Sequence, residues 1–327
     1  MKDVFPGIRQ NNFVVIGRVG MDMFPAAGEA VENADNFTAD MGGSSANIAA
    51  GIVKLGGAAA LVTRVSDDAV GRFCVNKLQH YGVETTHVTP VGGEARNSLA
   101  LYESRVEGHQ SVIYRNGAAD FEMTQADVEA VDYARFGALV TAGTVFAAEP
   151  SRAASFRAFE VARAAGLPVI FDIDYRPYSW PSAQVAETVL SKAGEMSDVI
   201  VGNDDEFGFM AGDKSKGLEK ARALAATTAA IVVYKMGEHG AITFANGKEL
   251  RTGIYPVTAL KPTGAGDSFM AGMLSSLAAG NDLKTAVLAG SACAAIVVAK
   301  PGCAPAMPFP QDLSNFLASH PGPTSAD

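Results

Sequence analysis

The stretch Thr263-Gly264-Ala265-Gly266-Asp267-Ser268-Phe269 precedes a long segment rich in Ala and Gly, which predicts a helix over 264–279. Gly264 and Gly266 leave backbone N–H groups unobstructed at the start of this helix, and such an N-terminus favours an anion. Asp267 could simply cap the helix. Beside an anion site it could also accept a hydroxyl proton during phosphoryl transfer to an alcohol. We expect the helix N-terminus to lower the pKa of Asp267.

Two other glycine clusters stand earlier in the chain. In Met41-Gly42-Gly43-Ser44-Ser45-Ala46-Asn47 the glycines permit close backbone approach, and Asn47 falls in the first turn of a predicted helix. Taken alone, this cluster is more often an ordinary capped helix than a ligand site. The second cluster, Lys235-Met236-Gly237-Glu238-His239-Gly240, follows an apolar strand. It indicates either a plain hairpin or a ligand site at the carboxyl end of a strand.

The rest of the chain alternates short apolar runs with helical patterns. The runs predict buried strands at 13–16, 60–63, 138–141, 168–171, 199–201 and 230–234. The patterns predict helices at 44–55, 69–81, 151–165, 182–193, 204–211, 216–226 and 283–299. This alternation is typical of an α/β fold with three layers (αβα) and a mainly parallel central sheet.

Two segments, 20–41 and 92–116, interrupt this alternation. Their extended stretches alternate polar and apolar residues, as the strands of a sheet with one solvent-exposed face do. We interpret them as a small antiparallel sheet that could close over a site as a lid. Edge hairpins of the main sheet are the alternative. Residues 1–320 are then one domain, and residues 321–327 are expected to form a disordered tail.

The composition excludes several classes of protein. The 327 residues are 48% hydrophobic and 19% charged, which is a globular composition. A net charge of −9 disfavours a nucleic-acid binder, and an anionic substrate would need a local cluster of Arg or Lys. The absence of a G-x-G-x-x-G fingerprint after the first strand disfavours a nicotinamide oxidoreductase, and there is no P-loop motif.

Cysteine usage and hydropathy favour a cytoplasmic protein that does not bind membranes. Cys74, Cys293 and Cys303 form neither a disulfide framework nor a metal-ligand spacing, which indicates a reducing compartment. The N-terminus lacks the apolar core of a signal peptide. The longest weakly polar stretch, between Lys284 and Lys300, is shorter than the about 20 residues that span a bilayer.

Taken in order, the clusters resemble the ribokinase-like (PfkB) carbohydrate kinases. The resemblance runs from Gly17 to Ala304 and rests on three motifs: G-G-x-x-x-N ending at Asn47, N-x-x-E over 203–206, and G-A-G-D over 264–267. It implies the ribokinase-like fold with a β-lid, ATP and Mg²⁺ as cofactors, and a homodimer formed through the lid.

The resemblance also implies roles for individual residues. Asp267 would be the catalytic base, and Gly264, Ala265 and Gly266 would form the anion hole. The substrate hydroxyls would be held by Asp22, Gly43 and Asn47, and the ATP site would be lined by Lys235, Gly237 and Gly240. The phosphate and a Mg²⁺ held through water would be organised by Asn203 and Glu206.

One position departs from the family pattern. Many members have an acidic residue three positions before the first glycine of G-A-G-D, where it helps to hold a monovalent cation. Here that residue is Lys261. We hypothesise that its ammonium replaces the cation, so that activity is independent of K⁺. A solvent-exposed Lys261 without a role is the alternative.

Arginines point to a sugar acid as the substrate. Asp172-Ile173-Asp174-Tyr175-Arg176-Pro177 follows a predicted strand and could be a turn with an internal Asp–Arg pair. Arg176 also suits bidentate recognition of a carboxylate, as do Arg115 in the predicted lid and Arg96. We expect all three arginines, together with Tyr114 next to Arg115, to bind the substrate. A neutral sugar needs no such cluster.

The D-x-D-Y-R-P-x-x-W run, together with Gly17-Arg18 and Lys261-Pro262, resembles the 5-dehydro-2-deoxygluconokinases of myo-inositol catabolism. This implies ATP-dependent phosphorylation of the terminal hydroxyl of 5-dehydro-2-deoxy-D-gluconate, giving the 6-phosphate. The 2-dehydro-3-deoxygluconokinases share the lid Tyr-Arg and are the nearest alternative. A ribokinase- or fructokinase-type sugar kinase and a non-catalytic sugar-binding homologue also stay open.

Overall fold

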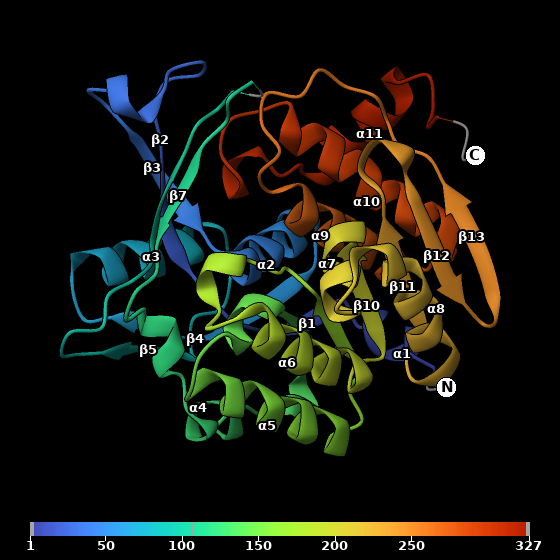
Figure 1. Cartoon of the computed structure of the whole chain (residues 1–327), viewed down its shortest axis with the longest axis horizontal. Coiled ribbons are helices and arrows are strands. Elements are labelled where there is room, and N and C mark those ends of the chain that lie inside the picture. The colour runs from blue at the N-terminus through green and yellow to red at the C-terminus, as the bar shows by residue number, and fades with distance from the viewer. Residues whose placement is uncertain (1–2, 106, 325–327) are drawn as a thin grey trace.

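The computed structural model describes residues 3–105 and 107–324 and is built around one large twisted sheet (Figure 1). Across these residues the sheet has nine strands in the order β13-β12-β11-β10-β9-β8-β1-β4-β5. From β11 to β5 all neighbouring strands are parallel, and the β11–β12 and β12–β13 pairs are antiparallel. The bounds of these strands are β1 (Asn12–Ile16), β4 (Ala58–Ser66), β5 (Val88–Val91), β8 (Ala138–Ala142), β9 (Val169–Asp172), β10 (Val199–Asn203), β11 (Ile231–Lys235), β12 (Ala241–Ala245) and β13 (Lys248–Thr252).

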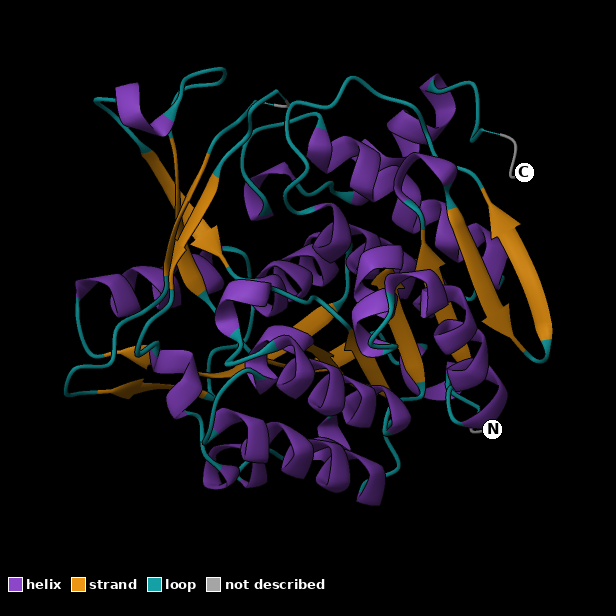
Figure 2. Ribbon diagram, in the orientation of Figure 1, coloured by secondary structure: helices purple, strands orange, loops and turns teal. Residues whose placement is uncertain are grey.

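Helices cover both faces of this sheet (Figure 2). On one face, side chains such as Val14 and Phe171 pack with Phe159 and Leu190 of the helices. The helices of that face are α4 (Gln125–Glu129), α5 (Ser151–Ala164), α6 (Ala183–Glu195), α7 (Asp204–Met210) and α8 (Gly217–Thr227). Because successive side chains of a strand point to opposite faces, the neighbours of Val14 pack on the other side.

That second face buries Phe13 and Val15 of β1 against residues such as Ile48 and Leu274. Its helices are α1 (Phe5–Ile8), α2 (Ser44–Lys54), α3 (Ala69–His80), α9 (Ala265–Ala278) and α10 (Leu283–Val298); α11 (Pro310–Ser319) packs outside α10. The two apolar clusters, one on each face, confirm the predicted three-layer α/β architecture with a mainly parallel central sheet.

A second sheet stands apart from the main one, at the upper left of Figure 1. Its strands are β2 (Gly20–Phe24), β3 (Thr38–Gly42), β6 (Leu99–Tyr102) and β7 (Ser111–Tyr114), in the order β3-β2-β6-β7. These strands fall within the two segments, 20–41 and 92–116, that interrupt the alternation in the sequence, apart from Gly42. The β2–β3 and β6–β7 pairs are antiparallel, whereas β2 pairs with β6 in parallel.

The predicted tail is held to the domain as far as Thr324. The Thr324 backbone N–H donates to the Ile254 carbonyl oxygen at 2.8 Å, and its Oγ1 accepts from the Ile254 N–H at 3.0 Å. The described part of the predicted tail therefore contacts the domain through Thr324, and residues 325–327 lie outside the described part of the chain. Among the helices described, none is long and apolar enough to cross a membrane.

Candidate active site

A cavity of about 560 Å³ opens where the carboxyl ends of β1, β8, β9, β10 and β11 meet the second sheet and the N-terminus of α9. Ligands of open α/β sheets bind at this edge of the sheet. The volume lies within the range of small-molecule sites. The cavity brings together most of the residues that the sequence singles out, from Asp22 to Asp267.

The N-terminus of α9 faces the cavity through Gly264, Ala265, Gly266 and Asp267. Gly264 precedes the helix in the left-handed region, with φ of +82°, and no side-chain cap is present among the described residues. A Cβ added to Gly266 would lie 3.6 Å from Lys235 Nζ and 3.9 Å from Asp172 Oδ2. The helix N-terminus and the ammonium of Lys235 therefore face the same small volume, as an anion hole requires.

Asp267 lies in the first turn of α9 and accepts a 2.9 Å hydrogen bond from Asn47 Nδ2 of α2. Burial, together with the charge of Asp174, raises the pKa of Asp267 to about 6, against the lowering effects of Asn47, Arg176 and Lys235. The expectation that the helix N-terminus would lower this pKa was therefore wrong, because desolvation of the carboxylate outweighs the dipole. A carboxylate that titrates near pH 6 is better suited to proton transfer than an ordinary one.

Asp22 and Gly43 line the cavity next to Asn47. Asp22 of β2 is only 2% exposed, and its Oδ1 has no hydrogen-bond partner among the residues described. Burial raises the pKa of Asp22 to about 7, although Arg18 opposes this effect. The Oδ1 of Asn47 is also buried and has no partner in the described chain. Two buried acceptors without donors are what a polyhydroxylated ligand would satisfy.

The three predicted arginines have different surroundings. Arg115 is buried, lines the cavity and forms an ion pair with Asp120. Arg176 lines it as well, with Nη2 2.7 Å from Asp174 Oδ1 and Nη1 3.8 Å from Glu206 Oε1. The cavity does not include Arg96, whose exposed guanidinium donates to the carbonyls of residues 93 and 95.

Tyr114 is also outside the cavity. Ser111, Ile113 and Arg115 line it, while Tyr114 is 59% exposed. Side chains alternate between the two faces of a strand, so Tyr114 lies on the outer face of β7. The placement of Tyr114 and Arg96 gives no support to their predicted roles in substrate binding.

Asn203, Glu206, Lys235, Gly237 and Gly240 line the other end of the cavity. Asn203 and Glu206 cap α7 reciprocally: Glu206 N–H donates to Asn203 Oδ1 at 2.9 Å, and Asn203 N–H donates to Glu206 Oε2 at 2.8 Å. This capping box fixes the direction of the Glu206 carboxylate. The 237–240 turn joins the antiparallel strands β11 and β12 as a hairpin, and Gly237 and Gly240 of the same turn line the cavity.

Lys261 is fully buried, so the alternative of an exposed lysine is wrong. Its Nζ donates a 2.6 Å hydrogen bond to the carbonyl oxygen of Thr263, immediately before the anion hole. Burial lowers the pKa of Lys261, and this lowering is opposed by Cys303, Asp267 and Asp22. The lysine therefore lies directly behind the 263–267 turn and is electrostatically linked to two carboxylates of the site.

Sequence reasoning did not assign roles to several residues that line the cavity. Arg18 and the Asp172–Asp174 pair were visible only as parts of motifs. Burial is the main cause that raises the pKa of Asp172, whereas Arg176 and a hydrogen bond from Ser44 hold the pKa of the equally buried Asp174 below its usual value. Other unassigned lining residues are Tyr102, His109, Thr144, Tyr178, Thr252, Ile254, Val287, Ser291 and Ala294. Tyr178 occupies a variable position of the D-x-D-Y-R-P-x-x-W run, and the others come from segments with no motif, so only the fold gathers them.

Comparison with known proteins identifies the class to which this fold and cavity belong. Residues 10–310 match the family described as "pfkB family carbohydrate kinase". The chain belongs to this family and is a carbohydrate kinase.

Relatives of similar length narrow the comparison. The chain is 35% identical over 317 residues to 5-dehydro-2-deoxygluconokinase from Geobacillus kaustophilus, with 94% of each chain covered. It is 36% identical over 322 residues to the protein of the same name from Bacillus velezensis, with 97% of each covered.

Solved structures share the fold at lower identity. The crystal structure of fructokinase with bound ATP from Xylella fastidiosa has a TM-score of 0.83 and 20% identity, covering 94% of this chain and 98% of that one. Fructokinase from Vibrio cholerae, in a form with fructose, ADP and calcium ion, has a TM-score of 0.82 and 23% identity, with 94% and 99% covered.

Proposed function

We propose that this kinase transfers the γ-phosphoryl group of ATP to the terminal hydroxyl of 5-dehydro-2-deoxy-D-gluconate and so forms the 6-phosphate, a step of myo-inositol catabolism. The observation that carries this proposal is the placement of Asp267 beside the open N-terminus of α9, in one cavity with Arg18, Arg115 and Arg176. The relatives named 5-dehydro-2-deoxygluconokinase support the choice among sugar acids.

The chemistry follows from the positions of three groups. Asp267 accepts the proton of the attacking hydroxyl, so that its oxygen forms the new bond to phosphorus as the bond to the β-phosphate oxygen breaks. The N–H groups that begin α9 and the ammonium of Lys235 stabilise the charge of the transferring phosphoryl group. Asp22, Gly43 and Asn47 hold the substrate hydroxyls, and Gly237 and Gly240 leave room for the nucleotide.

The acidic residues at the nucleotide end fit a hydrated Mg²⁺. Burial raises the pKa of Glu206 and of Asp172, and the negative charge of each neighbouring carboxylate adds to the effect. A divalent cation would relieve that repulsion, and bound Mg²⁺ neutralises the phosphate charge during transfer. No group of three or more His, Cys, Asp or Glu among the described residues could hold a metal ion by itself. We therefore assign Glu206 to the water shell of Mg²⁺ and Asn203 to the phosphates.

We propose that the ammonium of Lys261 replaces a monovalent cation. The buried Nζ at 2.6 Å from the Thr263 carbonyl oxygen supports this, because that contact places a positive charge behind the anion hole. Activity should then be independent of K⁺.

The same site leaves a second candidate substrate, 2-dehydro-3-deoxygluconate. It is an isomer that presents the same carboxylate and a terminal hydroxyl, so the arginines alone do not separate the two. A neutral sugar explains the buried arginines less well, and a non-catalytic homologue does not explain a carboxylate with a raised pKa at the anion hole.

We further propose a homodimer formed through the second sheet, which acts as a lid of the single domain 1–320. Its edge strand β7 presents Val112 and Tyr114 on an outer face, 39% and 59% exposed, which a second copy could cover. The free, buried state of Cys74, Cys293 and Cys303 is consistent with a cytoplasmic location.

The proposal is tested by identifying the product. The purified enzyme is incubated with ATP, Mg²⁺ and 5-dehydro-2-deoxy-D-gluconate, and the mixture is followed by ³¹P NMR with proton coupling. A new phosphomonoester signal coupled to the two protons of C6 supports the proposal. ADP formation without that ester, or an ester at another carbon, would overturn it.

A further inference from the structure

Arg18 is a buried cation whose charge no nearby acid neutralises directly. It follows β1, its side chain lines the cavity, and the residue is 6% exposed. Within residues 3–105 and 107–324, no carboxylate lies within 4.0 Å of its guanidinium. Its Nη1 donates a hydrogen bond to the neutral Ser98 Oγ at 2.7 Å. Burying an unpaired charge is costly, and an anionic ligand would offset that cost.

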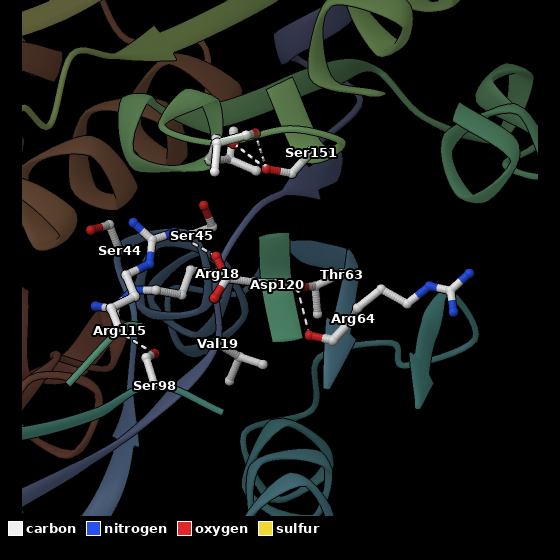
Figure 3. Close-up of polar contacts among 12 residues, drawn as sticks. Arg18, Val19, Ser44, Ser45, Thr63, Arg64, Ser98, Arg115, Asp120 and Ser151 are labelled. Atoms are coloured by element: carbon white, nitrogen blue, oxygen red, sulfur yellow. Dashed lines mark hydrogen bonds and ion pairs between the residues drawn. The ribbon is translucent and has the colours of Figure 1, made fainter. Parts of the chain in front are cut away.

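The other two arginines of the cavity differ in this respect. Arg176 shares its charge between Asp174 and Glu206, and Arg115 is paired with Asp120 (Figure 3). Their positive charge is largely balanced before any ligand binds. Arg18 therefore brings to this part of the cavity a charge that has no direct ion-pair partner among the described residues.

The backbone around Arg18 is held rigidly. The Ala46 N–H of α2 donates to the Arg18 carbonyl oxygen at 3.3 Å, and a Cβ on Gly43 would lie 2.5 Å from that oxygen. Asn97 Nδ2 donates to the carbonyl of the next residue, Val19, at 3.1 Å. The backbone is thus fixed by α2 and by the segment that leads into β6, and Ser98 of that segment orients the guanidinium, so less freedom is lost when it binds a ligand.

The charged and titratable groups that interact with Arg18 from neighbouring elements are Asp22, Asp120, Asp174, Cys74, Tyr102, Tyr178 and Arg115. Burial would lower the pKa of Arg18, but its neighbours reverse this, so the guanidinium stays charged. Arg115 adds a second guanidinium whose Nε and Nη1 are buried and have no partner among the described residues. Two guanidiniums with free donors form a receptor for a planar anion.

We propose that Arg18 is the specificity-determining residue that receives the substrate carboxylate, with Arg115 beside it, so that the enzyme prefers sugar acids to neutral sugars. This inference rests on the proposed function. The sequence-based expectation gave the carboxylate contact first to Arg176. Here the principal contact is given to Arg18, which lies between β1 and the lid strand β2.

The test compares an acid with a matched neutral substrate. kcat and KM are measured for 5-dehydro-2-deoxy-D-gluconate and for its primary amide, which keeps the shape and loses the charge. In the wild type we expect strong preference for the acid. Arg18→Gln should raise KM for the acid about 10²-fold and change KM for the amide and for ATP less than about threefold. Arg64→Gln, which removes an arginine paired with Asp127 outside the cavity, is the matched control and should leave the preference unchanged.

A milder variant guards against misfolding. Ser98→Ala removes the acceptor that orients Arg18 and should raise KM for the acid by about 3- to 10-fold, with kcat nearly unchanged. If wild type prefers the acid and both variants keep that preference, the role of Arg18 is wrong while the proposed function stands. Equal losses for acid and amide would assign Arg18 to structure instead. A wild type that turns over only neutral sugars would overturn both proposals.

Discussion

Asn47 Nδ2 of α2 lies 2.9 Å from Asp267 Oδ2 of α9 and joins two glycine-rich motifs that are 220 residues apart in the chain. The hydrogen bond is donated by a neutral amide to the anionic form of the carboxyl group. It therefore lowers the pKa of Asp267 against the larger effect of burial.

Asn47→Leu should shift the pH profile of the kinase. The wild-type rate is expected to fall as pH drops through about 6, because the base Asp267 becomes protonated. Without the amide donor this acid limb should move to higher pH by roughly one unit. Asn281→Leu, which removes an amide that bonds Ser276 at the end of α9, is the control. An unshifted limb in Asn47→Leu would show that Asp267 does not set the profile.

Asp267→Asn should lower kcat by about 10²–10⁴ and leave ATP affinity nearly unchanged. The amide keeps the size of the side chain and cannot accept the hydroxyl proton. Steady-state kinetics measures kcat, and calorimetric titration with a non-hydrolysable ATP analogue measures the affinity for the nucleotide. Asp213→Asn, at an exposed cap, should behave as the wild type. Turnover within fivefold of wild type would mean that positioning alone carries the reaction.

Gly264→Ala should abolish most activity, whereas Gly280→Ala should not. Both glycines have left-handed φ, +82° and +86°, so either alanine costs about 1–2 kcal/mol of stability. Only at Gly264 would the new Cβ press against Cys303 Sγ, at 3.0 Å; at Gly280 no described atom lies within 4 Å. Thermal unfolding and kcat of the two variants separate backbone strain from distortion of the anion hole. Equal activities would remove Gly264 from the site.

Asp22→Asn should make the ligand-free protein less sensitive to pH. The pKa of Asp22 is about 7 in the folded protein, above its ordinary value of 3.8, so the folded state binds the proton more tightly. The stabilisation from that proton is complete below about pH 4 and is lost as pH rises through about 7. Above pH 8 the variant should therefore melt about 2 °C or more above wild type, with substrate affinity lost.

The control for that experiment is Asp282→Asn. Asp282 caps α10 through Thr285, and its hydrogen bonds hold its pKa below the usual range. The Asp282→Asn variant should therefore lose as much stability as the wild type when the pH is raised from 5 to 8. A wild type that melts at the same temperature at pH 5 and pH 8 would contradict the assignment of Asp22.

Lys261→Met should lower kcat at least about tenfold and make the residual activity rise with K⁺, while wild type is equally active in K⁺ and in tetramethylammonium salts. Lys54→Met is the control: Lys54 is also buried, its Nζ donates to the carbonyls of Ala304 and Pro305 rather than to Thr263, and it does not line the cavity. A wild type that requires K⁺ would rule out substitution of the cation by Lys261.

Much of the fold could be predicted because it depends on local patterns. Apolar runs such as 13–16 and 199–201 lie in strands buried on both faces, and the Gly-Ala-Gly turn begins α9 as expected. The glycine cluster at 264–266, singled out from the sequence, lines the cavity. These features require only short-range chemistry and the periodicity of the chain.

Charge partners could not be predicted in this way. The sequence does not show that Tyr114 and Arg115 point to opposite faces of β7, or that Arg176 is neutralised by Glu206 from another strand end. The raised pKa of Asp267 likewise depends on burial by elements that are distant in sequence. Tertiary packing decides each of these properties, and Arg18 is recognisable as an unpaired cation only once that packing is known.

The most direct test of the function is a comparison of kcat/KM with ATP across four substrates: 5-dehydro-2-deoxy-D-gluconate, 2-dehydro-3-deoxy-D-gluconate, fructose and ribose. We expect the first to exceed its isomer by at least about tenfold and the neutral sugars by more than about 10³-fold, in a coupled assay of ADP release. A higher kcat/KM for fructose or ribose than for either acid would contradict a sugar-acid kinase.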